Sequence, residues 1–534
     1  MRTIYFGGPI ITMEGENDRP EAVLVEDGKI KKAGTLDEVC KAVSGRVEMR
    51  NLDGRCLMPG FVDPHGHITM NGQMSLCADL SECVNFDEIV AVLKKFITDN
   101  KITAKNAVVG YGYDHNFLEE KSHPTRAVLD KASTEIPIMA MHISGHLGCA
   151  NSPAIKAAGI SAETPDIEGG KIGRIPGTME PDGYFEEGGL MMLQPAVRKL
   201  VKVDINKMLS TMEDIYIKNG VTTVQDGATT APDLKMLKAA NTLGKLKIDV
   251  VAYPLLSSDG RKLAKKNKSF VRKYRKHLKI GGYKLVLDGS PQGRSAWVTK
   301  PYLGGEEGYC GYPWMKDEEV EKYITQTLKD GQQLLAHCNG DAAGDQLLSL
   351  YKKAYDASDN PDKDKLRPTM IHCQLARNDQ LDKMAELNMI ASIFVSHVYY
   401  WGNIHLMNFG PERGEHISPV KDALDRGLIV NFHTDTPVTK PKMLHSVWCA
   451  VNRINRDGNV IGADQAISVY EALKAITING AYEYFEEDSK GSIKEGKRAD
   501  MVILDRCPLD VDKMEIKDIE VLETIKDGRT IYKA

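Results

Sequence analysis

The sequence lacks the features that mark secreted, membrane-spanning or nucleic-acid-binding proteins. Its ten cysteines are scattered and include no Cys-x-x-Cys pair, so we expect reduced thiols in a cytoplasmic protein rather than a disulfide framework. No uninterrupted apolar run approaches the roughly 18 residues that a membrane span needs. The net charge is only −5, which excludes a strongly basic surface for nucleic acid or anionic lipid.

Other features that the sequence lacks narrow the classes of protein to which it can belong. The first 20 residues interrupt their apolar pattern with glycine, proline and acidic side chains, so we do not expect a signal peptide there. The chain has no internal repeat and no low-complexity tract. Hydrophobic residues make up 42% and charged residues 27% of its 534 positions, which is typical of a globular protein with a sizeable core. This length suits a large barrel with a companion domain.

The two ends of the chain share one pattern. Short β-rich runs within residues 3–35 flank Asp27-Gly28, and similar runs near the C-terminus flank Asp527-Gly528. Asp-Gly between such runs is typical of a tight hairpin turn. Because the termini of folded domains often lie close together, we predict one small β-sandwich domain built from residues 1–57 and 489–534.

The middle of the chain alternates apolar strand-like runs with helical segments. The runs are the one that precedes His65, then 221–227, 248–256, 283–290, 333–341, 369–375, 389–397 and 428–435. Eight buried strands with intervening helices predict an α/β fold, a (β/α)8 TIM-like barrel over residues 58–488. This count requires residues 70–215 to be an insertion after the first strand, with strands and glycine-rich loops of its own.

Two histidines follow the first strand-like run, in the stretch MPGFVDPHGHITM from Met58 to Met70. Residues i and i+2 of a strand point to the same side, so His65 and His67 are predicted to face the barrel axis together. There two imidazoles can bind one ion. Gly66 between them is expected to face outward, where space is short.

Four more polar residues fall on later strands: Lys284 on the fourth, His337 at the end of the fifth, His372 at the end of the sixth and Asp435 at the end of the eighth. The active sites of barrels form at the carboxyl ends of their strands. Imidazole and carboxylate suit zinc and similar divalent ions. His-x-His alone is a weak signal, and a lone buried histidine is more often structural, so the prediction depends on the whole set.

The order of these motifs resembles the metal-dependent amidohydrolase superfamily, and within it the branch of YtcJ-like and N-substituted formamide deformylase-like amidohydrolases. The resemblance covers essentially the whole chain, including a large insertion after the first strand. It is carried by LMPGFVDPHGH, SGHLGCANSPAIKAAGI, GGYKLVLDGSPQGRSA, LAHCNGDAA, MIHCQLA, NFHTDTPV and GSIKEGKRADMVILD.

The resemblance implies a hydrolase that cleaves a carbon–nitrogen bond of amide type, other than a peptide bond, in a small-molecule substrate. A metal-activated hydroxide would attack, with Asp435 as general base and then general acid. One or two divalent ions, zinc first, would be held by His65, His67, His337, His372, Asp435 and a carboxylated Lys284, which would carry carbon dioxide as a carbamate. Burial beside positive charge favours the neutral amine that this carbamate requires.

Several residues have weaker assignments. His146, Asp288 and Trp297 are candidates for substrate binding or for support of the ligands. Glu187 matches a glutamate of the family, although a solvated surface acid fits equally well. His397 and His433 depart from the family pattern, and they could adjust substrate choice or bind a further ion.

Two alternatives remain open, a deaminase of the same superfamily and a non-catalytic regulatory member of the fold. Deaminases of this kind usually use one metal and lack the lysine of the fourth strand, so Lys284 argues against the first. Silent members typically lose ligands, whereas all six positions are filled here. A homodimer is compatible with the sequence, which gives no sign of a nucleic-acid or membrane partner.

Overall fold

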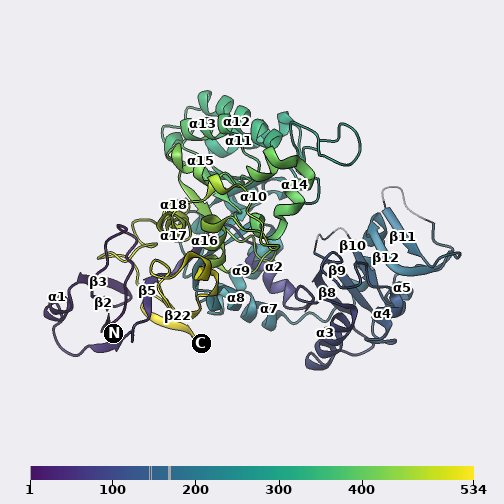
Figure 1. Cartoon of the computed structure of the whole chain (residues 1–534), viewed down its shortest axis with the longest axis horizontal. Coiled ribbons are helices and arrows are strands. Elements are labelled where there is room, and N and C mark those ends of the chain that lie inside the picture. Colours follow the sequence, from purple (N-terminus) through teal and green to yellow (C-terminus); the bar gives the residue numbers. More distant parts are fainter. Residues whose placement is uncertain (1, 144, 146, 166–169) are drawn as a thin grey trace. The chain divides into compact units, whose positions relative to one another are not determined.

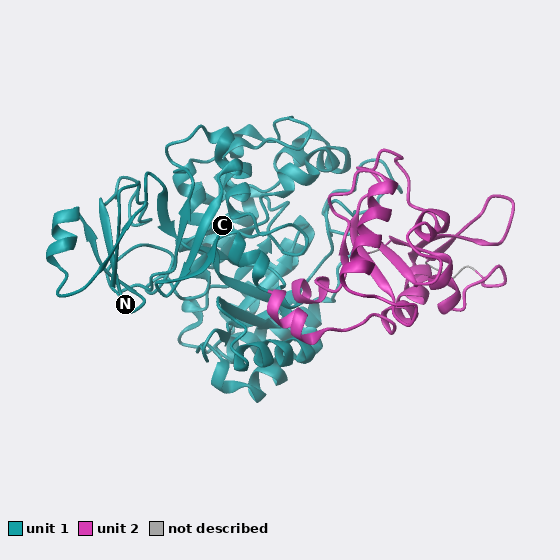
Figure 2. Cartoon of the chain, turned by 90° about the horizontal axis from the view of Figure 1, so that it is seen from below, with its two compact units in different colours: residues 1–69, 213–534 teal, residues 70–212 magenta. Residues whose placement is uncertain are grey.

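The computed structural model describes residues 2–143, 145, 147–165 and 170–534. The chain divides into two compact units, each with its own sheets and core (Figure 2). Unit 1 combines Met1–Thr69 with Glu213–Ala534, and unit 2 is Met70–Met212. Unit 2 therefore falls within the region 70–215 that the sequence pattern sets apart.

Unit 1 contains two parallel sheets, which give it an α/β fold. The first has the order β6 (Phe61–Asp63), β13 (Val221–Thr229), β14 (Asp249–Pro254) and β15 (Leu278–Ile280). The second has the order β16 (Gly282–Val286), β17 (Gln333–Cys338), β18 (Thr369–His372), β19 (Ile390–Ile393) and β20 (Val430–Phe432). Each of the eight expected runs overlaps a strand of these two sheets. Nearly all their residues are buried, as parallel strands covered on both faces require.

Helices alternate with these strands. Those of unit 1 are α1 (Leu36–Lys41), α8 (Asp214–Lys218), α9 (Ala231–Thr242), α10 (Gly260–Lys266), α11 (Asp317–Lys329), α12 (Asp341–Asp356), α13 (Asn378–Glu386), α14 (His397–Glu415), α15 (Val420–Asp425), α16 (Met443–Asn452), α17 (Val469–Ala475) and α18 (Ile478–Glu483). Helix α11 shows why they form. It buries Val320, Ile324 and Leu328, spaced four residues apart on one face. Its acidic first turn and Lys329 in its last turn complement the helix dipole.

The two ends of the chain form two further four-stranded sheets of unit 1. One has the order β3 (Lys29–Gly34), β2 (Ala22–Glu26), β1 (Arg2–Phe6), β4 (Glu48–Asn51), and the other β23 (Arg529–Lys533), β22 (Val521–Lys526), β21 (Met501–Leu504), β5 (Cys56–Pro59). Strand β5 pairs with β21, so N-terminal purple and C-terminal yellow strands lie side by side (Figure 1). One hydrophobic cluster includes Val25, Met501 and Ile525, and so joins both sheets.

Unit 2 has a single six-stranded sheet. Its order is β11 (Gly170–Arg174), β12 (Pro181–Glu187), β10 (Leu147–Ala150), β9 (Ile138–His142), β8 (Val108–Tyr113) and β7 (Ala78–Asp79), with β7, β8 and β9 parallel. Val108 and Ile138 belong to one hydrophobic cluster, and the next residues, Val109 and Met139, to another. Because successive residues of a strand point to opposite faces, both faces of the sheet are covered.

The helices of unit 2 are α3 (Phe86–Asp99), α4 (Arg126–Asp130), α5 (Ser152–Ala157), α6 (Gly188–Arg198) and α7 (Ile205–Thr211), and α2 (Ile68–Met74) begins in unit 1 and ends in unit 2. None of the helices in the described ranges combines the length and the apolar character that crossing a membrane requires. All ten cysteines are free thiols.

A buried ion cluster joins β14 to the C-terminal segment of unit 1. Asp249 is fully buried at the start of β14. Its carboxylate accepts hydrogen bonds from Lys490 (2.6 Å), Lys526 (2.7 Å), Arg498 (2.7 Å) and His277 (2.8 Å). Burial alone would raise the pKa of Asp249, but the surrounding cations outweigh it and hold that pKa well below its ordinary value.

We expect Asp249→Asn to lower the free energy of unfolding by about 3–5 kcal/mol, because it leaves buried cations without their shared anion. Urea unfolding at pH 7 measures this loss, with the exposed ion-pair variant Asp356→Asn as a control that changes little. The folded-state pKa of Asp249 is depressed, so its contribution is present above the unfolded value of about 3.9 and is lost as pH falls below it. Equal stability of Asp249→Asn and wild type at pH 7 would contradict this assignment.

Candidate metal centre

Six polar side chains of unit 1 lie at or near the ends of five strands of its parallel sheets. Lys284 and His337 lie within β16 and β17, and His372 ends β18. His65 and His67 follow β6, and Asp435 follows β20. In parallel sheets the carboxyl ends of neighbouring strands meet at one edge, and that is where these residues gather.

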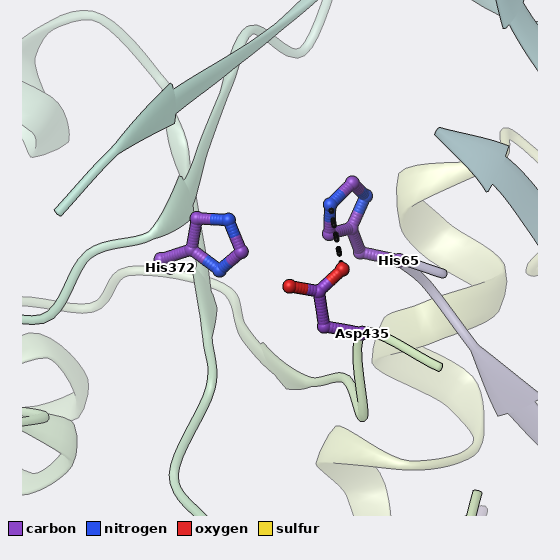
Figure 3. A group of neighbouring side chains, drawn as sticks. All are labelled: His65, His372 and Asp435. Atoms are coloured by element: carbon purple, nitrogen blue, oxygen red, sulfur yellow. Dashed lines mark ion pairs between the residues drawn. The ribbon is translucent and has the colours of Figure 1, made fainter. Parts of the chain in front are cut away.

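One part of this group surrounds the carboxylate of Asp435. Its Oδ1 lies 3.5 Å from Nε2 of His65 and 3.2 Å from Nε2 of His67. Nζ of Lys284 lies 3.3 Å from the same Nε2 of His65. Figure 3 shows His65, His372 and Asp435, which come from three different segments, pointing toward one another.

The other part is a pair of histidines. Nδ1 of His337 lies 2.9 Å from Nε2 of His372. The rings of His372 and His65 have their centroids 5.4 Å apart, which connects this pair to the first part. Ligand atoms of His65, His372 and Asp435 all lie within 4.8 Å of one another.

The distances of 3.5 Å and 3.2 Å from Oδ1 of Asp435 to the two imidazoles fit ligands arranged around a metal ion. Zinc bonds of about 2.0–2.2 Å in tetrahedral geometry separate the ligand atoms by about 3.3–3.6 Å. Among the described residues, Oδ1 of Asp435 and Nδ1 of His372 are buried without a hydrogen-bond partner. Buried polar atoms normally have partners, so these two indicate a group that completes the site. The residues present therefore fit a divalent metal.

The charge states also suit a metal. Burial, helped by neighbouring positive groups, lowers the pKa of His65 and His372 well below the ordinary value and that of His337 to about 4. Neutral imidazole is the form that binds metal. Burial also lowers the pKa of Lys284 to about 8.

For two of the rings, hydrogen bonds from outside the set decide which nitrogen faces inward. Nδ1–H of His65 donates to Oε1 of Gln225 at 2.6 Å, which leaves the lone pair of Nε2 facing Asp435. Nε2–H of His337 donates to the carbonyl of Gly289 at 3.2 Å, so its Nδ1 faces His372. Such partners orient metal-binding imidazoles.

Unusual backbone conformations and backbone hydrogen bonds also fix the positions of these candidate ligands. His372 has φ +73° and Asp435 has φ +53°, conformations that cost free energy in residues other than glycine and that persist at functional sites when the surroundings enforce them. The N–H of Asp435 donates to the carbonyl of His65 at 3.1 Å, and the N–H of His67 donates to that of Thr436 at 2.7 Å. The first and last strand segments of the predicted barrel are thereby joined.

Sequence reasoning missed three supporting residues. Besides Gln225, Gly227 lies against His65, because a Cβ at position 227 would lie 2.5 Å from its Cε1. Asp63 is fully buried and accepts a hydrogen bond from Oγ1 of Thr434 at 2.5 Å. Burial raises the pKa of Asp63 to about 7. The available signal was the pair of polar residues within the second strand-like run, VTTVQDG, and the aspartate two positions before His65.

Two of the weaker candidates lie beside His337. Asp288 is fully buried, and its carboxylate lies 3.5 Å from Nε2 of His337. It accepts hydrogen bonds from the backbone N–H groups of Trp297, Asn339 and Gly340. Burial raises its pKa to about 7. Trp297 is half-buried, and its hydrogen bond to Asp288 is made by its backbone.

The remaining candidates fall in different places. His433 is buried with its ring centroid 5.1 Å from that of His65, and neither ring nitrogen has a partner among the described residues. His397 is buried too, with Nδ1 3.2 Å from Nε2 of His405. Glu187 is exposed at the end of β12 in unit 2. His146 lies outside the described residues.

Comparison with known proteins identifies the family of this chain. The Amidohydrolase family matches residues 48–532. The chain is 27% identical over 548 residues to YtcJ of Bacillus subtilis (strain 168), which is named as an amidohydrolase, covering 100% of this chain and 99% of that one. It is 28% identical over 544 residues to N-substituted formamide deformylase of Arthrobacter pascens, covering 98% and 96%.

A solved structure agrees in fold. The crystal structure of a metal-dependent hydrolase from Pyrococcus horikoshii OT3 matches with a TM-score of 0.76 at 23% identity, over 96% of this chain and 99% of that one. The family match spans nearly the whole sequence. The chain therefore belongs to the Amidohydrolase family.

Proposed function

We propose that this protein is a metal-dependent hydrolase that cleaves a carbon–nitrogen bond of a non-peptide amide in a small molecule. The observation that carries the proposal is the convergence of His65, His372 and Asp435, whose ligand atoms lie within 4.8 Å of one another. Membership of the Amidohydrolase family supports the reaction type. The named activity of the Arthrobacter pascens relative makes N-substituted formamides the first substrates to test.

The proposed ligands are His65, His67, His337, His372, Asp435 and a carboxylated Lys284, and the proposed metal is zinc. The lowered pKa values of His65, His337 and His372 support these three histidines as neutral ligands, and the position of His67, 3.2 Å from Oδ1 of Asp435, supports the fourth. For Lys284, a pKa of about 8 leaves about one amine in ten uncharged at pH 7. That amine attacks carbon dioxide, forms the N–C bond of a carbamate and releases one proton. The new carboxylate would replace a buried positive charge with a negative one beside cations.

A divalent ion bound here would lower the pKa of a water toward 7 and polarise the scissile carbonyl. Asp435 would then transfer the protons, as general base and general acid. Burial opposes its charge, but His67 and other neighbours outweigh that effect and hold its pKa below the ordinary value, so it is ionised at neutral pH. An ionised carboxylate can accept the proton of the attacking water and return it to the leaving nitrogen.

We also propose the architecture that brings the ligands together. Residues 58–488 would form a (β/α)8 barrel with 70–215 inserted. The parallel bridge between Leu255 and Lys284 supports closure on one side, and the hydrogen bond from Asp435 to His65 supports it on the other. Residues 1–57 and 489–534 would form one β-sandwich domain, which their shared hydrophobic cluster supports. Ten free thiols favour a cytoplasmic location.

Metal removal tests the proposed function directly. Chelator-treated protein is expected to lose hydrolysis of N-formyl amines, N-acyl amino acids and cyclic amides, and zinc is expected to restore it. Circular dichroism before and after treatment controls for unfolding, and simple esters serve as the comparison for the type of bond. Full activity in protein that elemental analysis shows to be free of metal would refute the proposal.

Asp435→Asn tests the proton shuttle. The variant keeps the side-chain volume and one ligand oxygen but cannot accept a proton, so kcat is expected to fall about 10²–10⁴-fold while metal content is retained. Asp425→Asn, in an exposed ion pair with Lys421, is the matched control. Turnover within a few-fold of wild type would show that another group, with His433 the first to examine, moves the proton.

Gly227→Ala tests whether the support of His65 matters. The new methyl group would lie 2.5 Å from Cε1 and 2.7 Å from Nδ1 of that ring, so the ring must move. Since a displacement of about 1 Å can cost about 100-fold in rate, hydrolysis is expected to fall by that order and to need more free zinc. Gly15→Ala, where the added Cβ meets nothing closer than 3.6 Å, should behave as wild type. Identical zinc dependence of the two variants would contradict this role.

A further inference from the structure

Unit 2 contains a second cluster of metal-ligand type, formed by Asp114, His115 and His142. Strands β8 and β9 are parallel neighbours, and the register pairs Tyr113 with His142 at their carboxyl ends. Asp114 and His115 follow β8 directly, so the three residues meet at one edge of the sheet. Ligands of α/β sheets commonly bind at the carboxyl ends of parallel strands.

The three ligand atoms form a compact triangle. Nδ1 of His115 lies 3.2 Å from Nε2 of His142. Oδ1 of Asp114 lies 3.4 Å from that Nε2 and 3.8 Å from the Nδ1 of His115. Tetrahedral zinc with bonds of about 2.0–2.2 Å separates its ligand atoms by about 3.3–3.6 Å. The triangle is therefore close to one face of a zinc tetrahedron.

A chain of hydrogen bonds explains this triangle less well. When His115 and His142 share one proton, one nitrogen donates and the other presents a lone pair. Nε2–H of His142 can donate to Nδ1 of His115 at 3.2 Å or to Oδ1 of Asp114 at 3.4 Å, so one proton is shared by two acceptors that lie 3.8 Å apart. A shared cation attracts all three atoms at once.

The surroundings hold the three side chains in place. Oδ1 of Asp114 accepts hydrogen bonds from the backbone N–H of Asn116 (2.9 Å) and from its side-chain amide (3.0 Å). The ring of His123 stacks on that of His115 with centroids 4.1 Å apart. His123 in turn is 2.9 Å from the hydroxyl of Tyr113. Partners of this kind orient metal ligands in known sites.

We propose that Asp114, His115 and His142 form a second metal site, which binds a divalent transition-metal ion of the zinc type. Two imidazoles and one carboxylate are a set that zinc accepts, with a fourth position left for water or another ligand. The site is built entirely from unit 2, whereas the six proposed ligands of the hydrolytic centre belong to unit 1. It therefore does not depend on the proposed reaction.

The test uses the full chain with the unit 1 centre disabled by His65→Ala and His372→Ala. This background is stripped with a chelator and then titrated with zinc against a chromophoric competitor. It is expected to bind one equivalent of zinc. Adding His115→Ala or Asp114→Asn should weaken that binding by more than tenfold, since loss of an outer partner alone costs about 10–100-fold.

His416→Ala is the matched control, because this half-buried histidine also faces an aspartate, Asp422, at 3.7 Å, but lies in unit 1. It should leave zinc binding unchanged. A background that binds no zinc, or equal affinity in all variants, would overturn the proposal. If the background does not fold by circular dichroism, elemental analysis of wild type and single His115→Ala decides: the variant should hold one metal fewer, and equal contents would refute the site.

Discussion

The structure depends on a set of buried polar groups in unit 1 that satisfy one another only in part. His65, Lys284 and His372 are almost completely buried, and atoms of His372 and Asp435 have no hydrogen-bond partner among the described residues. Removing such groups from water costs free energy that neutral imidazoles cannot recover from each other. On the proposed assignment, a shared cation would recover it by binding the imidazoles and the carboxylate. The hydrogen bond between His65 and Gln225 would then orient the imidazole toward that cation, and the left-handed backbone at Asp435 would orient the carboxylate.

That the candidate ligands lie close together could be predicted from the sequence because strand geometry is simple. A period of two predicts His65 and His67 on one side of a strand; the structure places both just after β6 instead, although both still face Asp435. The carboxyl ends of parallel strands meet at one edge of the sheet. His337 and His372, which lie near the ends of two such strands, can therefore be predicted to lie close together before any contact between them is known. The α/β character followed from the same alternation of buried runs with amphipathic segments, of which α11 is a clear example.

The supporting contacts could not be predicted in this way. A period of two says which side Gln225 faces, but the bond to His65 depends on how two sheets of strands are placed in three dimensions. Gly227 is required only because the ring of His65 lies 2.5 Å from where a Cβ would be. In unit 2, His115 and His142 are 27 residues apart, and the sequence pattern does not predict which strands of this region pair. Only the register of β8 with β9 brings the two histidines together.

The two proposed metal sites, one in each unit, differ in the free energy that an empty site would cost. The side chain of His65 is 1% exposed, whereas those of Asp114 and His115 are 14% and 28% exposed. Water can solvate the second pair when no ion is bound, but it cannot reach His65. An empty site in unit 1 would therefore leave His65 and His372 buried, with Nδ1 of His372 lacking a partner among the described residues, where the local backbone is already strained at His372 and Asp435. On this argument, the metal proposed for unit 1 would stabilise its folded structure more than the metal proposed for unit 2 would stabilise its sheet.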